Sequence, residues 1–186
     1  PIDKALIGFC GAPWTVATYM LDGVARTIGK GERANARTYA YADPEGVDAL
    51  LAILVEASAW YLKMQVDAGA QALQVFESWA EGLPDDLFER LVVKPHQMLL
   101  ARLSELGVRV PIIGFPRGSA ALVEDYAARV PVQAIGLDTA CPLAVGRRVQ
   151  AIKPIQGALD PLVLRAGGAA LDRRIDQLLD SWGNGP

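Results

Sequence analysis

Residues 43–76, DPEGVDALLAILVEASAWYLKMQVDAGAQALQVF, contain the start, the body and the end of a helix and then a strand. Asp43 can cap the first free amides of the helix, and Pro44 suits its first position. Gly69 is expected to end the helix, and the run Ala72–Phe76 has the composition of a buried strand. Residues at approximately helical spacing are expected to form the buried face of this helix: Val47, Leu50, Leu51, Leu54, Ser58, Tyr61 and Leu62.

The same alternation of strand and helix extends in both directions along the chain. Five short apolar runs are expected to be strands: Ala5–Cys10, Ala72–Phe76, Val110–Phe115, Ala134–Leu137 and Ile152–Gln156. Further helices are expected after Pro84 and over 95–106, 119–129, 142–150 and 171–179. The runs are continuous, as in a parallel sheet covered on both faces. With no Asn-Gly or Asp-Gly hairpin signal, the pattern predicts a parallel α/β fold.

Two parallel architectures fit this pattern, a doubly wound sheet and a (β/α)8 barrel. The first strand is not followed by a G-x-G-x-x-G turn, which weakens the dinucleotide-binding version of the doubly wound sheet. A complete barrel takes about 250 residues, so five βα units in 186 residues would form an incomplete one. We expect residues 1–186 to form a single domain.

The composition excludes several classes of protein. The chain is 52% hydrophobic and 21% charged with a net charge of -3, which is typical of a soluble protein. Its basic residues are scattered, which argues against nucleic acid as a partner, and residues 49–62, the longest apolar stretch, are too short to span a membrane. Two distant thiols, Cys10 and Cys141, favour a reduced, cytoplasmic protein without a metal site.

Polar and special residues gather directly after the expected strands, at the edge that carries chemistry in α/β barrels. They form five segments: Gly11-Ala12-Pro13-Trp14-Thr15 with Ala17-Thr18-Tyr19-Met20, Phe76-Glu77-Ser78-Trp79-Ala80, Gly136-Leu137-Asp138, and Gln156-Gly157-Ala158-Leu159-Asp160-Pro161. In this order, and together with Leu6-Ile7-Gly8-Phe9, they resemble the uroporphyrinogen decarboxylase family. The resemblance extends from about Ala5 to Trp182.

The resemblance implies a (β/α)8 barrel, of which this chain would hold roughly the third to seventh strands. The family's Arg-Gln-Ala-Gly-Arg motif, an early active-site Asp and a Gly-His-Gly motif have no counterpart here. The chain also begins at Pro1 without Met and ends in residues 181–186, which have the character of a helix exit. We therefore expect a fragment or a product of proteolysis.

The family removes the four acetate carboxyl groups of uroporphyrinogen III, giving coproporphyrinogen III and carbon dioxide without a metal or organic cofactor. The resemblance further implies a homodimer. It places no catalytic residue in this chain, and it matches Tyr19 and Ser78 to residues that contact the substrate. We expect the 186 residues alone to lack turnover, although the parent would be a carboxy-lyase of porphyrin and haem biosynthesis.

Structural explanations compete with these assignments. Tyr19 could be a core tyrosine with a local partner, and Ser78 could be a turn or cap residue after a strand. Glu77 and Ser78 are adjacent in an extended segment, so they are not expected to face the same pocket.

Other polar residues have two interpretations each. Asp138 could be a catalytic carboxylate, but we favour a turn or cap role, and Arg117 could attract an anionic substrate or lie solvated at the surface. His96 is expected to be an ordinary helix residue. Ala158 stands where the family usually has Asn, and Thr139-Ala140-Cys141 replaces the common Trp-Thr pattern.

Two other functions remain open at this point. A related methyltransferase on the same barrel would need a zinc site of His and Cys ligands, for which one His and two distant Cys offer no suitable spacing. A non-catalytic chain that binds porphyrin-like anions or pairs with another subunit is also possible, because fold similarity does not establish catalysis.

Overall fold

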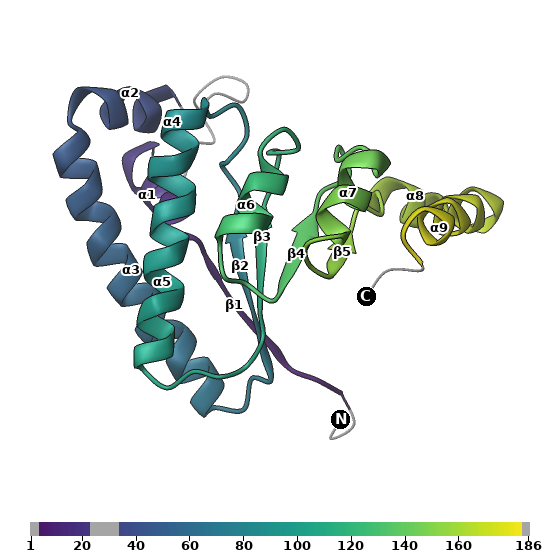
Figure 1. Ribbon diagram of the computed structural model, residues 1–186, viewed down its shortest axis with the longest axis horizontal. Coiled ribbons are helices and arrows are strands. Elements are labelled where there is room, and N and C mark those ends of the chain that lie inside the picture. Colours follow the sequence, from purple (N-terminus) through teal and green to yellow (C-terminus); the bar gives the residue numbers. More distant parts are fainter. Residues whose placement is uncertain (1–3, 23–33, 184–186) are drawn as a thin grey trace.

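The computed structural model describes residues 4–22 and 34–183 and contains one parallel sheet (Figure 1). Its strands pair in chain order, β1-β2-β3-β4-β5. A doubly wound sheet would reverse its strand order at a switch point, so the order confirms an incomplete barrel of five βα units. The strands are β1 (Ile7–Gly11), β2 (Ala72–Glu77), β3 (Ile112–Pro116), β4 (Ala134–Leu137) and β5 (Ile155–Gly157).

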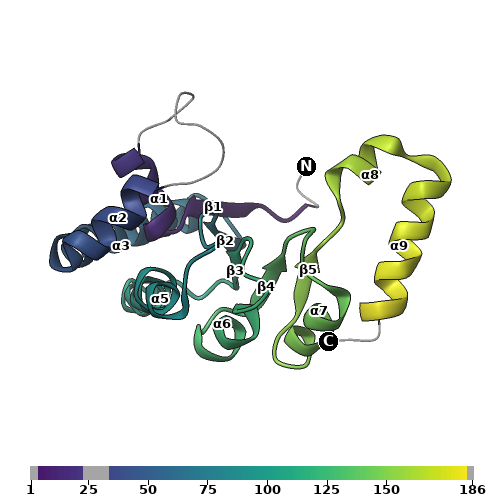
Figure 2. The ribbon, with the colours of Figure 1, turned by 90° about the horizontal axis from the view of Figure 1, so that it is seen from above.

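Helices follow each strand, and Figure 2 shows α5, α6 and α7 side by side along the sheet. The predicted start of the long helix is confirmed, since the Asp43 carboxylate accepts the Gly46 amide at 2.9 Å. The helices are α1 (Pro13–Asp22), α2 (Ala34–Ala42), α3 (Pro44–Asp67), α4 (Asp85–Phe88), the π-helical turn η1 (Glu89–Val93), α5 (Lys94–Glu105), α6 (Val123–Arg129), α7 (Leu143–Gln150), α8 (Pro161–Ala166) and α9 (Gly168–Trp182).

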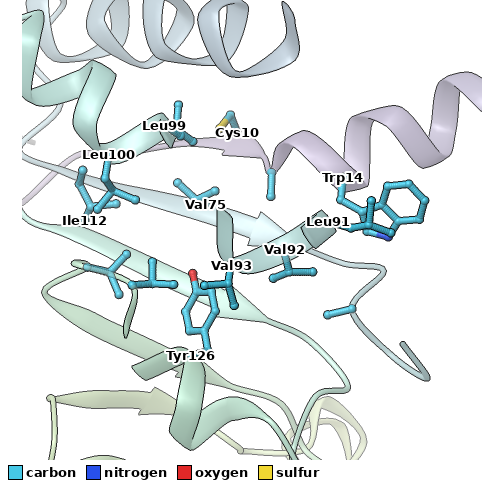
Figure 3. Packing of buried hydrophobic residues seen from close by; sticks show 14 of the residues in the cluster. Cys10, Trp14, Val75, Leu91, Val92, Val93, Leu99, Leu100, Ile112 and Tyr126 are labelled. Atoms are coloured by element: carbon cyan, nitrogen blue, oxygen red, sulfur yellow. The ribbon is translucent and has the colours of Figure 1, made fainter. Parts of the chain in front are cut away.

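The hydrophobic core lies between the sheet and these helices (Figure 3). On β2 the buried residues alternate with half-buried ones, so Leu73, Val75 and Glu77 share the helix-facing side. On the other face, Phe9 is 59% exposed. The expectation that both faces are covered is therefore wrong for β1 of the described structure.

The inner face of the sheet is lined by aromatic rings from adjacent strands. The ring of Phe76 makes edge-to-face contacts with Phe9 at 5.9 Å and with Phe115 at 5.8 Å between centroids. A β-carbon at Gly136 would lie 2.8 Å from the Phe115 ring, so a larger residue there would displace it. The strand alternation thus separates an aliphatic helix-facing side from an aromatic inner side.

The last described helix docks on α7. The indole of Trp182 donates to the Leu143 carbonyl at 3.0 Å, and the Gln150 amide donates to the Trp182 carbonyl at 2.7 Å. The helix ends at Trp182, where a helix exit was predicted, while residues 184–186 and Pro1 lie outside the described residues. Within the described ranges, none of the helices has the length and hydrophobicity that crossing a membrane requires.

Candidate functional site

The candidate site is built at the carboxyl ends of β1 and β2, where α1 begins. Glu77, the last residue of β2, is fully buried. The hydroxyl of Thr15 on α1 donates to Glu77 Oε1 at 2.5 Å. The same hydroxyl oxygen accepts the Ser78 amide at 2.8 Å, and Glu77 Oε1 also accepts the Trp79 amide at 3.3 Å. One carboxyl group therefore fixes the chain where it leaves the sheet.

The structure brings the two predicted substrate contacts, Tyr19 and Ser78, to this edge. Ser78 is half-buried and lies in the turn directly after β2, the position that its alternative interpretation as a turn residue expected. Tyr19 lies one turn after Thr15 on α1, is 42% exposed and makes an edge-to-face contact with Trp79 at 6.0 Å between ring centroids. The partly exposed Tyr19 differs from the core tyrosine considered as its alternative.

Burial controls the protonation of this site. Loss of hydration raises the pKa of Glu77 to about 8, although the bonds from the Thr15 hydroxyl and the Trp79 amide act in the opposite direction. Burial also raises the pKa of Cys10 to about 12, with a smaller contribution from the charge of Glu77. A carboxyl group with such a pKa is mostly neutral at pH 7.

The loops after β3 and β4 are joined by Asp138. One carboxylate oxygen accepts the Gly118 amide at 2.6 Å, and the other accepts the Ala140 amide at 2.8 Å. The predicted turn role of Asp138 is thereby confirmed, and the residue also links two loops of the site edge. Arg117 is exposed beside it, while its backbone amide donates to the Glu77 carbonyl at 2.9 Å.

The loop after β5 has a strained backbone at the position where the chain departs from the family pattern. Gly157 has φ of 103°, and a β-carbon there would lie 2.5 Å from the Leu137 carbonyl oxygen. Ala158 has φ of 59°, the left-handed region, in which Asn is better tolerated than Ala. Ala158 therefore holds a backbone conformation that is less favourable for Ala than for Asn.

His96 lies away from this edge, as predicted. It is fully buried on α5, where Nδ1 lies 2.8 Å from the Val92 carbonyl oxygen, and burial lowers its pKa to about 4. Over residues 4–22 and 34–183, we find no cluster of three or more His, Cys, Asp or Glu side chains that could hold a metal ion.

Sequence reasoning missed the pairing of Thr15 with Glu77. These residues are 62 positions apart, so no local spacing reveals their contact. One signal was available in the sequence: Glu77 follows Leu73 and Val75 on the same face of the expected strand. A single carboxyl group on a buried face requires a hydrogen-bond partner.

The parallel sheet has its strands in chain order, which is typical of the α/β-barrel class. Polar side chains lie at the carboxyl ends of its strands, where such proteins bind small molecules. Residues 2–186 match the family described as uroporphyrinogen decarboxylase (URO-D). The chain belongs to that family.

Individual relatives have the same name. A uroporphyrinogen decarboxylase of Caulobacter vibrioides (strain NA1000 / CB15N) is 59% identical over 184 residues, which cover 99% of this chain and 51% of the relative. One from Phenylobacterium zucineum (strain HLK1) is 60% identical over 186 residues, with 99% and 52% covered. One from Hyphomonas neptunium (strain ATCC 15444) is 44% identical. The chain spans about half the length of the curated relatives it matches.

Proposed function

We propose that this chain forms part of the substrate pocket of an enzyme that decarboxylates the four acetate side chains of uroporphyrinogen III to give coproporphyrinogen III. The observation that supports the proposal is the position of Tyr19 and Ser78 at the carboxyl edge of β1 and β2, where the Tyr19 ring contacts Trp79 and the Ser78 amide donates to Thr15. The family membership and the shared name of the relatives support the same reaction.

Each decarboxylation exchanges a carboxylate for a proton. The acetate group loses carbon dioxide, and the carbon that remains gains one proton to become a methyl group. Protonation of a pyrrole carbon makes the ring its own electron sink, so the reaction needs no cofactor. The protein has to position a flexible polyanion and stabilise charge.

Tyr19 and Ser78 suit the binding part of this task. In the proposal, the Tyr19 and Ser78 hydroxyl groups donate hydrogen bonds to substrate carboxylates. The aromatic inner face formed by Phe9, Phe76 and Phe115 supplies apolar surface for the macrocycle. Neither Tyr19 nor Ser78 is assigned a proton-transfer role.

We propose a homodimer in the cytoplasm, with residues 1–186 forming a single domain. The 186 residues by themselves are expected to lack turnover, because the family's Arg-Gln-Ala-Gly-Arg and Gly-His-Gly motifs have no counterpart among them. A homogeneous preparation of the chain that releases coproporphyrinogen would contradict this expectation.

The test is a chimera in which this chain replaces the matching 51% of the Caulobacter vibrioides relative. We expect the chimera to convert uroporphyrinogen III to coproporphyrinogen III, measured anaerobically by chromatography of the oxidised porphyrins. The single changes Tyr19→Phe and Ser78→Ala should each raise KM about 10- to 100-fold, since each loses a hydrogen bond to a charged group worth about 1.5–3 kcal/mol.

A control variant distinguishes the loss of a substrate contact from a nonspecific effect of removing a hydroxyl group. Tyr41→Phe removes a hydroxyl from a tyrosine on α2 that is 57% exposed, and KM should not change. A folded chimera that binds porphyrin without releasing carbon dioxide would favour the non-catalytic alternative. Unchanged kinetics in both Tyr19→Phe and Ser78→Ala would refute the assigned contacts.

A further inference from the structure

The hydroxyl group of Thr15 acts both as a hydrogen-bond donor and as a hydrogen-bond acceptor. It donates to Glu77 Oε1 at 2.5 Å and accepts the Ser78 amide at 2.8 Å. Thr15 is 3% exposed and Glu77 is fully buried, so water does not compete for these groups. The backbone of Ser78 is therefore held by a chain of two hydrogen bonds that begins at the Glu77 carboxyl.

The same carboxyl group also reaches Tyr19 through Trp79. Glu77 Oε1 accepts the Trp79 amide at 3.3 Å, and the Trp79 ring contacts the Tyr19 ring edge-to-face. Thr15 and Tyr19 are four residues apart on α1 and so lie on one face of the helix. A shift of the Glu77 carboxyl would thus move both candidate substrate contacts.

Glu77 is oriented away from the substrate side. It shares the helix-facing side of β2 with Leu73 and Val75, and none of its surface is exposed. A contact with substrate would require the opposite side of the strand, where Phe76 lies. Glu77 can therefore act on the reaction only through other residues.

We propose that Glu77 and Thr15 are a buried positioning pair that sets the geometry of Ser78 and Tyr19 toward the tetrapyrrole carboxylates. This inference rests on the proposed function, since it assigns a role at the same site. Neither residue is a catalytic residue, because neither reaches the substrate.

Two substitutions of Thr15 in the chimera test the pair. Thr15→Val keeps the shape of the side chain but removes the hydroxyl, whereas Thr15→Ser keeps the hydroxyl and loses a methyl group. We expect Thr15→Val to raise KM for uroporphyrinogen about tenfold with kcat within about threefold. Thr15→Ser should restore KM to near the unsubstituted value, which a packing role would not explain.

Glu77 provides an independent pair of variants. Glu77→Gln keeps an oxygen that can accept from Thr15 and Trp79, so KM should stay near the unsubstituted value. Glu77→Leu removes the oxygen that accepts both hydrogen bonds and should reproduce the raised KM of Thr15→Val. Circular dichroism and thermal unfolding establish that each variant is folded at the assay temperature.

A second measurement uses the 186-residue chain itself and does not depend on enzymatic activity. Amide hydrogen exchange of Ser78 should accelerate about tenfold or more in Thr15→Val and stay unchanged in Thr15→Ser. Equal KM in Thr15→Val and the unsubstituted chimera would overturn the inference, as would equal losses in the Val and Ser variants. An inactive unsubstituted chimera would count against the proposed function, and the exchange of Ser78 would then decide the inference alone.

Discussion

Replacing Glu77 by Gln should change how the stability of the chain depends on pH. The folded chain buries the Glu77 carboxyl completely, and this burial raises its pKa to about 8 from the ordinary 4.5. Unfolding restores the ordinary pKa, so between these values the unfolded chain ionises more readily. The stability contributed by the neutral carboxyl is complete below pH 4.5 and is lost as the pH rises to 8.

The magnitude follows from the difference in pKa. Each pKa unit corresponds to about 1.4 kcal/mol, so the loss over the whole interval is about 5 kcal/mol. About 2 kcal/mol of it falls between pH 6.5 and 8. The free energy of unfolding should therefore decline over that interval in the unsubstituted chain and stay flat in Glu77→Gln, which cannot ionise.

His96 limits the window in which this effect can be measured. Its pKa is lowered from 6.5 to about 4 by burial, so its contribution to stability is complete above pH 6.5 and is lost as the pH falls toward 4. The slopes of Glu77 and His96 oppose each other between pH 4.5 and 6.5. Cys10 has a raised pKa of about 12 and contributes only above its ordinary value of 9.

Urea unfolding followed by tryptophan fluorescence, repeated at half-unit steps from pH 6.5 to 8, measures the slope directly. The control is Glu45→Gln, a carboxylate in the exposed first turn of α3, which should keep the decline of the unsubstituted chain. A free energy of unfolding that falls as steeply in Glu77→Gln as in the unsubstituted chain would refute this prediction. The prediction is refuted equally if neither protein loses stability over the interval.

Three further changes test other parts of the fold. Tyr126→Phe removes a buried hydroxyl that has no hydrogen-bond partner among the described residues, and its unfolding free energy should be unchanged or rise by about 1 kcal/mol in urea titration. Gly146→Ala places a β-carbon against the Trp182 ring, so α9 should detach and thermal unfolding should show a loss of about 1–3 kcal/mol, whereas an unaltered Tm would contradict the docking of α9 on α7. Ala158→Gly removes the strain of a left-handed backbone conformation and should stabilise the chain by about 1 kcal/mol in the same assay. A destabilised variant would show that Ala158 is not strained.

The strands and long helices could be predicted because their signals are local. Asp43 and Pro44 mark the start of α3 as predicted, and the five apolar runs coincide with the five strands to within a few residues. The choice between two parallel architectures could not be made from periodicity. Both produce the same alternation, and only the pairing order of the strands distinguishes them.

Two helices escaped prediction, and in the helical region expected after Pro84 the π-helical geometry of one turn did so too, each for a different physical reason. The helix α2 has no apolar stripe, and it is held by the small residues Ala36 and Ala40, which are fully buried against its neighbours. The helix α8 has a clear start, since Asp160 accepts the Leu162 amide at 2.8 Å, but the motif that contains Asp160 does not by itself predict a helix. The π-helical turn η1 precedes Pro95, which has no amide hydrogen to donate to the preceding turn.

The candidate site was predicted in its parts but not in its connections. Motif resemblance indicates Tyr19 and Ser78 as substrate contacts, which stays a prediction, and Ser78 lies in the turn after β2 beside the buried Glu77. The bonds of Thr15 to residues more than sixty positions away depend on how α1 packs against β2. Such contacts are products of the tertiary fold, so no pattern within one segment contains them.

The pairing of every strand with its neighbour in the chain has a consequence for biosynthesis. As the polypeptide leaves the ribosome, β2 can pair with β1 before β3, β4 and β5 have been made. The hydrogen bonds of Thr15 to Glu77 and Ser78 require only those first two strands and α1. This part of the candidate site can therefore form before β3, β4 and β5 have been made, and those strands are then added to an edge that already exists.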